Sequence, residues 1–130
     1  MSYGTTKVDT IQSSTASTPP TFKDGNGTQI GTLCRAWVNF NGTGTVAIRG
    51  SFNVSSITDN GTGDYTINFT NAMPDANYAY TCGAGDNTNA SLLTVSNGSV
   101  YSTTALRVHV TYVNTSGNYD TPYINVAIFR

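Results

Sequence analysis

Apolar and polar side chains alternate along the chain with a period of two from residue 33 to the C-terminus. In the segment 34–40 (CRAWVNF), cysteine, alanine, valine and phenylalanine alternate with Arg35, Trp37 and Asn39. Further alternating or apolar runs occupy residues 46–54, 65–69, 78–82, 92–95, 100–102, 106–112 and 123–129. Because successive side chains of a β-strand point to opposite faces, each run predicts a strand with one face on a core.

Short segments rich in glycine, asparagine and aspartate separate these runs and predict tight turns. Residues 59–64 (DNGTGD) predict a hairpin between the runs on either side, Asn-Gly at 97–98 predicts a second hairpin, and 114–118 predicts a turn. The apolar residues of the run before the first of these turns are expected to share one face: Val46, Ile48, Phe52 and Val54. Gly50 inside that run predicts a bulge or a close backbone approach. No helical period is sustained, so the pattern predicts an all-β domain over 32–130, an antiparallel, jelly-roll-like β-sandwich of seven to eight strands.

Residues 1–31 differ from the rest and predict an extended N-terminal arm or linker. Residues 13–20 (SSTASTPP) are of low complexity, and their two prolines favour polyproline geometry and exclude a central strand. Residues 24–27 (DGNG) predict a turn. Two interpretations stay open: a linker without a role of its own, or an arm that lies along a neighbouring subunit or docks into a larger particle.

The composition indicates association and argues against several partners. Only 10% of the 130 residues are charged, with a net charge of −1 and no glutamate, against about 25% charged residues in an average soluble domain. Such a surface resists association weakly, which favours an oligomer or a larger assembly. The few arginines are scattered, so no nucleic-acid partner is expected. No apolar run approaches the roughly 20 residues of a membrane span, and no secretory leader is recognisable, so we expect no membrane insertion and synthesis in a cytosol.

Residues that could carry catalysis or bind a metal are few and dispersed. His109 is the single histidine, and it lies on the polar side of its predicted strand. The aspartates fall mostly in predicted turns, where they have a conformational role. Cys34 and Cys82 are either buried thiols or a cross-strand disulfide, and the sequence leaves both open. We therefore expect a non-enzymatic protein with no catalytic residues, no cofactor and no metal site.

Aromatic side chains near polar turns are the best candidates for recognition. The chain has eight tyrosines, five phenylalanines and one tryptophan. Tyrosine beside asparagine and aspartate is typical both of surfaces that bind sugars and of protein interfaces. The candidate recognition contacts are Tyr101, Tyr119, Tyr123, Asp86, Asn87 and Asn89.

The segment 34–80, which reads CRAWVNFNGTGTVAIRGSFNVSSITDNGTGDYTINFTNAMPDANYAY, resembles a recurrent module near the C-terminus of bacteriophage and prophage tail-fibre proteins. Residues 24–32 (DGNGTQIGT) resemble the stretch that precedes it. The resemblance implies a virion structural protein that mediates host receptor binding, with other virion proteins as partners and a host surface glycan or receptor as ligand. It also implies a homotrimer.

Two further expectations follow from that resemblance. Arg35 and Trp37 face away from the inward side chains of their strand, so we expect them at a subunit interface. The alternative to receptor binding is a capsid decoration or tail adaptor protein that acts purely in particle assembly.

Overall fold

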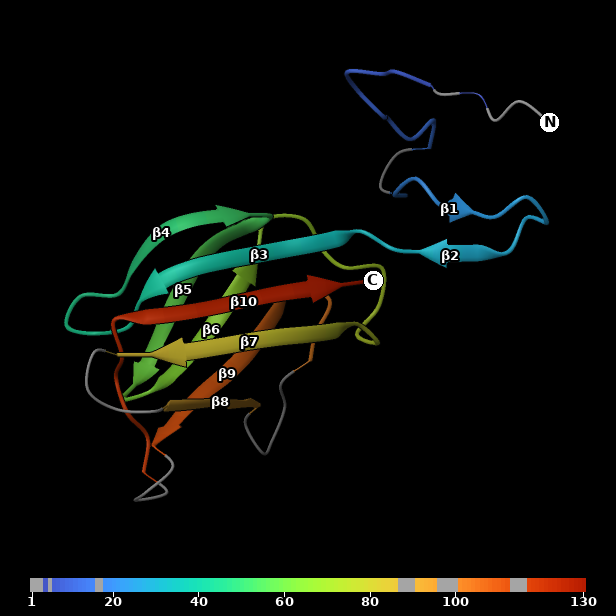
Figure 1. Cartoon of the computed structure of the whole chain (residues 1–130). Helices are drawn as coiled ribbons and strands as arrows, with labels where there is room; N and C mark the ends of the chain where they lie inside the picture. Colours follow the sequence, from blue (N-terminus) through green and yellow to red (C-terminus); the bar gives the residue numbers. More distant parts are fainter. Residues whose placement is uncertain (1–3, 5, 16–17, 87–90, 96–100, 113–116) are drawn as a thin grey trace. The chain divides into compact units, whose positions relative to one another are not determined.

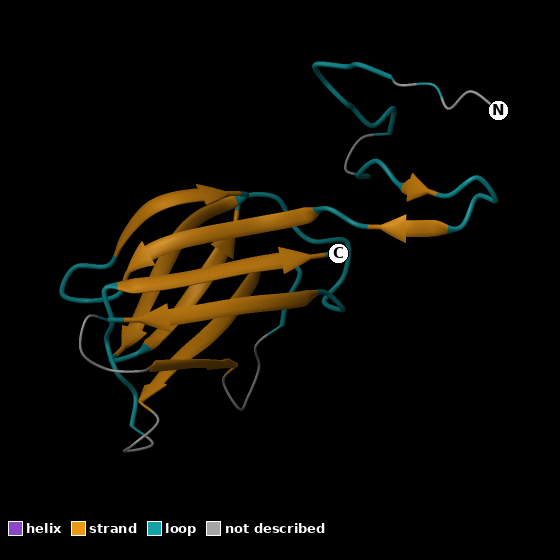
Figure 2. Cartoon of the chain, in the orientation of Figure 1, coloured by secondary structure: helices purple, strands orange, loops and turns teal. Residues whose placement is uncertain are grey.

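The computed structural model describes residues 4, 6–15, 18–86, 91–95, 101–112 and 117–130 of the chain. The chain divides into two units, residues 1–33 and residues 34–130. All regular structure in the described residues is β-strand (Figure 2). The strands are labelled in Figure 1.

The first unit contains a two-stranded antiparallel hairpin, β1 (Phe22–Lys23) and β2 (Gln29–Gly31). The carboxylate of Asp24 closes its loop by accepting hydrogen bonds from the backbone N–H groups of Asn26 and Thr28, both at 2.9 Å. Gly27 has a φ of 83°, which glycine adopts without steric cost. The turn predicted at 24–27 therefore forms the loop of a hairpin within the segment expected to be extended.

The second unit is a sandwich of two four-stranded antiparallel sheets. The first sheet has the order β4-β3-β10-β7, built from Ala47–Phe52, Cys34–Asn41, Tyr123–Phe129 and Ala79–Gly85. The second has the order β5-β6-β9-β8, built from Val54–Gly61, Asp64–Phe69, Ala105–Tyr112 and Ser91–Val95. The two sheets form two layers (Figure 1). The predicted antiparallel all-β sandwich of seven to eight strands is confirmed.

The core is formed by the inward side chains of both sheets, as the alternation predicts. On β3 the buried residues are Ala36, Val38 and Phe40, and the intervening positions are more exposed. The same pattern holds on β6, β9 and β10. Large aromatic rings join the layers: Phe40 of the first sheet meets Tyr65 of the second edge to face, with ring centroids 5.3 Å apart.

The run at 46–54 is not one strand with a single apolar face, and that expectation was wrong. The chain passes from the first sheet to the second at Asn53, which has a φ of 55°. The Asn53 side chain stabilises this crossing by donating to Arg35 O at 3.0 Å and accepting from the N–H of Asn71 at 2.8 Å. Val54 therefore begins β5 and is buried, whereas Ile48 and Phe52 stay exposed on the edge strand β4.

The predicted bulge near Gly50 is confirmed, because Asn39 pairs with Gly50 and the next residue, Phe40, pairs with Ile48. The first predicted hairpin forms between β5 and β6, but its loop is shorter than expected because β5 continues through Gly61.

The second predicted hairpin, around 97–98, falls on residues outside the described part, as do residues 114–116 of the last predicted turn. Strand β8, which precedes the predicted hairpin loop, pairs with β9. Tyr101, which follows it, makes an isolated bridge to Leu106.

Candidate functional site

The outer face of the second sheet is polar, and its side chains bond to one another. Asn68 Nδ2 donates to Thr58 Oγ1 at 2.9 Å and to Ser56 Oγ at 3.1 Å. Asn60 Nδ2 donates to Thr66 Oγ1 at 2.9 Å. Cross-strand pairs of this kind stabilise a sheet and use up hydrogen-bonding groups that a ligand would otherwise reach.

An ion cluster around Asp64 completes that face. Its carboxylate accepts from Arg107 Nε at 2.8 Å and from Arg107 Nη2 at 2.5 Å, and His109 Nε2 lies 3.1 Å away. The hydrogen bond from Arg107 is the main cause that lowers the pKa of the Asp64 carboxyl from its ordinary value of 3.8. The single histidine of the chain thus faces a carboxylate that Arg107 already binds through two oxygens, which is the geometry of a structural ion pair.

Asp64 is expected to make the free energy of unfolding fall at acid pH. Because its pKa is lower in the folded than in the unfolded state, its contribution is complete above about pH 4 and is lost as the pH falls through the folded pKa. Asp64→Asn should therefore lower the free energy of unfolding by about 1–3 kcal/mol near neutral pH, and by progressively less in acid. Urea denaturation at a series of pH values measures this.

The matched control is Asp75→Asn. The Asp75 carboxylate pairs with Arg130 at 2.5 Å, and that contact lowers the pKa of Asp75. The Asp75 side chain is more exposed than that of Asp64. Asp75→Asn should therefore have the same sign of pH dependence and a smaller size. A loss for Asp64→Asn that does not change with pH would contradict the prediction.

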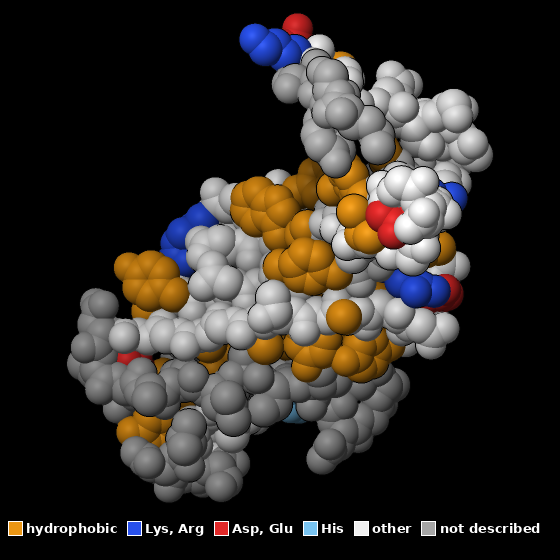
Figure 3. Space-filling view, turned by 45° about the vertical axis from the view of Figure 1, so that its right-hand side comes forward, with side chains coloured by type: hydrophobic (Ala, Val, Ile, Leu, Met, Phe, Trp, Pro, Cys, Tyr) orange, Lys and Arg blue, Asp and Glu red, His pale blue; other side chains and the backbone are white. Residues whose placement is uncertain are grey.

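The outer face of the first sheet has a different chemistry. Trp37 lies opposite Phe52 on one neighbouring strand and opposite Ala127 on the other. Trp37, Phe52 and Tyr123 are 43%, 56% and 47% exposed. Hydrophobic and uncharged side chains predominate in the view of Figure 3. Aromatic side chains exposed on a sheet are typical of a binding surface.

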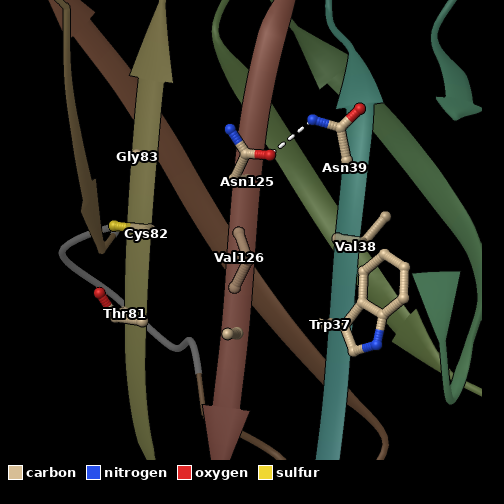
Figure 4. Close-up of a pocket in the computed structure, with 9 residues that line it drawn as sticks. Trp37, Val38, Asn39, Thr81, Cys82, Gly83, Asn125 and Val126 are labelled. Atoms are coloured by element: carbon tan, nitrogen blue, oxygen red, sulfur yellow. Dashed lines mark hydrogen bonds between the residues drawn. The ribbon is translucent and has the colours of Figure 1, made fainter. Parts of the chain in front are cut away.

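A depression of about 430 Å³ lies on this face, and we call it the Trp37 pocket. Its nine lining residues come from three adjacent strands and carry no formal charge: Trp37, Val38, Asn39, Thr81, Cys82, Gly83, Asn125, Val126 and Ala127 (Figure 4). The strand order β3-β10-β7 brings them together from three distant parts of the chain. Small residues on β10 and β7 leave room in front of the sheet.

Two asparagines occupy facing positions in the Trp37 pocket. Asn39 and Asn125 are directly opposite in the ladder of β3 and β10. Their side chains are joined by a hydrogen bond of 2.5 Å from Asn39 Nδ2 to Asn125 Oδ1, drawn in Figure 4. The next residue across the sheet, Gly83, has no side chain to cover them.

The structure brings some of the sequence-predicted site residues to this face. Trp37 and Tyr123 are exposed on it, and Arg35 shares the side of β3 that Trp37 occupies. The guanidinium carbon of Arg49 lies 4.8 Å from the centre of the Tyr123 ring, which is a cation–π contact.

Two other predicted receptor contacts, Tyr101 and Tyr119, pack against tyrosines outside the Trp37 pocket. Tyr101 packs against Tyr78 and Tyr80, with ring centroids 5.2 and 5.9 Å apart. Burial raises the pKa of Tyr78 to about 12 and that of Tyr80 to about 12. Tyr119 packs against Tyr112, with ring centroids 5.8 Å apart. Tyr101 therefore lies at the start of β7, whereas Tyr123 pairs with Gly85 at its end.

The other predicted contacts come from the segment after β7. Asp86 directly follows that strand, and Asn87 and Asn89 lie outside the described residues.

The sequence interpretation missed Asn39 and Asn125 as site residues. Each is an amide at an outward position between apolar inward neighbours, which is a signal that the alternation contained. The alternation does not show that β3 and β10 are neighbours, so it could not place these two amides, 86 residues apart in sequence, side by side.

Cys34 and Cys82 do not form a disulfide. They lie on β3 and β7, which are separated by β10, and two strand spacings of about 4.8 Å exceed the reach of a disulfide. Both cysteines are therefore thiols, as one of the two interpretations had it, but they are half-buried rather than buried. Partial burial raises the pKa of the Cys82 thiol.

The described residues and the comparison with known proteins narrow the class of site. Among the described residues, no three histidine, cysteine, aspartate or glutamate side chains gather where they could hold a metal ion. The same residues contain no helix of the length and hydropathy needed to cross a membrane. The chain matches no known family model, no curated protein and no solved structure. The fold and the Trp37 pocket thus define an antiparallel β-sandwich with an uncharged aromatic and amide surface on one sheet.

Proposed function

We propose that this chain is a non-enzymatic virion structural protein of the tail-fibre type, and that the outer face of its first sheet mediates attachment to a host receptor. The observation that carries the proposal is the exposure of Trp37, Phe52 and Tyr123 on a sheet whose other face is fully packed. A rigid sheet presents its side chains at little conformational cost, so contact energy is not spent on ordering the surface.

The side chains of the Trp37 pocket suit binding rather than acid–base or nucleophilic chemistry. Such chemistry needs titratable groups held at a pKa near the working pH. Of the nine lining residues, Cys82 alone has a titratable side chain, and burial raises the pKa of its thiol, which disfavours the reactive thiolate.

The proposal includes a homotrimer in the virion with other virion proteins as partners. The resemblance of residues 34–80 and the net charge of −1 support it. Because Trp37 borders the pocket, we assign it to ligand contact, and Arg35 stays the candidate for subunit contact.

Assembly through the first unit is the second candidate function. Its apolar side chains Val8, Ile11 and Ile30 are exposed, Ile30 by 68%. An apolar segment of this kind favours docking onto another protein, as a capsid decoration or tail adaptor protein would need.

Attachment is tested with the full chain, fluorescently labelled, on a panel of bacterial cells. A double change of Trp37→Ser and Phe52→Ser should weaken binding by at least about tenfold, because aromatic anchors supply most of the energy of such contacts. Flow cytometry measures binding, and circular dichroism checks the fold.

The matched control is a double change of Phe22→Ser and Ile30→Ser in the first unit, which should leave cell binding unchanged. If the control reduced incorporation into particles while the sheet variant changed neither property, the assembly role would replace the attachment role.

A further inference from the structure

We infer that the Trp37 pocket binds a neutral sugar residue, with Trp37 as the stacking platform and the Asn39–Asn125 pair as the hydrogen-bonding group for two sugar hydroxyls. The inference rests on the proposed function, because it names the ligand class of the same face.

The indole of Trp37 lies at the edge of the pocket and against Gly50 of β4. A Cβ atom at Gly50 would lie 3.4 Å from Cη2 and 3.5 Å from Cζ3 of Trp37, so the six-membered ring rests over a residue that has no side chain. Figure 4 shows the ring nearly face-on beside β3. A flat, accessible indole is suited to the C–H face of a pyranose, which is apolar and similar in width.

The amide pair supplies matched polar groups. The bond between Asn39 and Asn125 uses one donor and one acceptor, so the pair retains one carbonyl oxygen and one amino group whichever way the two amides are turned. Neither side chain makes another hydrogen bond to a described residue. Each sugar hydroxyl both donates and accepts, so two adjacent hydroxyls can bond to this pair at once.

The size and charge of the pocket narrow the ligand further. Its volume of about 430 Å³ lies in the range of roughly 300–1,000 Å³ that is usual for small-molecule sites. None of its nine lining residues carries a formal charge, and the nearby guanidinium of Arg49 packs on Tyr123. A phosphate, sulfate or carboxylate would lose its hydration here with no counter-charge in return. The ligand is therefore an uncharged sugar.

The test uses the full chain labelled with ¹⁵N and titrated with methyl glycosides of glucose, galactose and mannose and with methyl N-acetylglucosaminide. At least one should bind with a dissociation constant on the order of 1 mM. Binding of that sugar should change the NMR chemical shifts of the Trp37 indole N–H and of the side-chain amides of Asn39 and Asn125. Glucose 6-phosphate is the anionic probe and should bind at least about tenfold more weakly.

Three variants separate the sugar site from a structural effect. Trp37→Ala should weaken binding of the sugar by at least about tenfold. Ala127→Leu should do the same by filling the pocket from the opposite strand. Ile48→Ala should leave the affinity unchanged, because Ile48 is exposed on the edge strand β4 and does not line the pocket.

Each result bears on the inference separately from the proposed function. Equal sugar affinity in Ala127→Leu and in the wild type would overturn the inference. The inference would also fail if none of the glycosides bound while the Trp37→Ser and Phe52→Ser double variant still lost attachment to cells. Dissociation of an oligomer by Ala127→Leu, measured by sedimentation and without sugar binding, would assign the pocket to a second copy of the chain. Sugar binding without attachment to cells would support the sugar site and refute the attachment role.

Discussion

Gly63→Ala is expected to destabilise the protein by about 2–5 kcal/mol, the sum of a positive-φ cost and a steric overlap in a packed site. Gly63 has a φ of 62° in the loop between β5 and β6. A Cβ atom there would lie 2.6 Å from Tyr119 N and 2.6 Å from Val110 O. Those two backbone atoms are hydrogen-bonded to each other at 3.0 Å, so neither moves without breaking the bond.

The backbone of Gly63 is itself part of the same junction. Its carbonyl accepts from the N–H of Val110 at 2.8 Å, and its N–H donates to the carboxylate of Asp120 at 2.7 Å. An added methyl group would therefore displace the start of β6 from β9 and from the segment before β10. Urea denaturation with tryptophan fluorescence measures the loss.

Gly44→Ala is the matched control for the steric part. Gly44 also has a φ of 62°, but nothing lies within 4 Å of a Cβ atom placed there. This variant should lose only about 1–2 kcal/mol, the cost of a left-handed backbone for alanine. Equal losses in the two variants would show that the close contact at Gly63 costs nothing.

Phe40→Ala is expected to lower the free energy of unfolding by about 3–5 kcal/mol, because it removes a large side chain from a core that cannot collapse around the gap. Phe40 is 0% exposed and meets Tyr65 edge to face. Tyr65 is also held by its hydroxyl, which lies 2.7 Å from Asp120 Oδ1 and 2.9 Å from Gly42 O. The ring of Tyr65 therefore has little freedom to fill the space.

Phe52→Ala is the control for Phe40→Ala, since it makes the same chemical change on the neighbouring strand. Phe52 is exposed, so this variant should change the free energy of unfolding by less than about 0.5 kcal/mol. Phe40→Ala should also affect the Trp37 pocket. Trp37 and Asn39 lie on β3 together with Phe40, so a weaker core should loosen the strand that presents the pocket. A similar loss in both variants, measured by urea denaturation, would contradict the assignment of Phe40 to the core.

The alternation of side chains determined which faces of the strands are buried. On β3, β6, β9 and β10 the inward and outward residues are those that the pattern predicts, because the period of two is a local property of an extended backbone. The turn chemistry likewise located the loop at 24–27 and, within 59–64, the shorter loop between β5 and β6. The outward positions of Trp37 and Tyr123 follow from the same local rule.

Only the tertiary structure decided which strands are neighbours, and the candidate site depends on that choice. Asn39 and Asn125 meet because β10 inserts between β3 and β7, and the run at 46–54 divides because Asn53 passes the chain to the other sheet. The tertiary structure likewise packs the Tyr101 ring against Tyr78, away from the Trp37 pocket. Strand pairing depends on long-range closure of the chain and on which faces can be buried together, and a pattern that repeats every two residues looks the same for any partner.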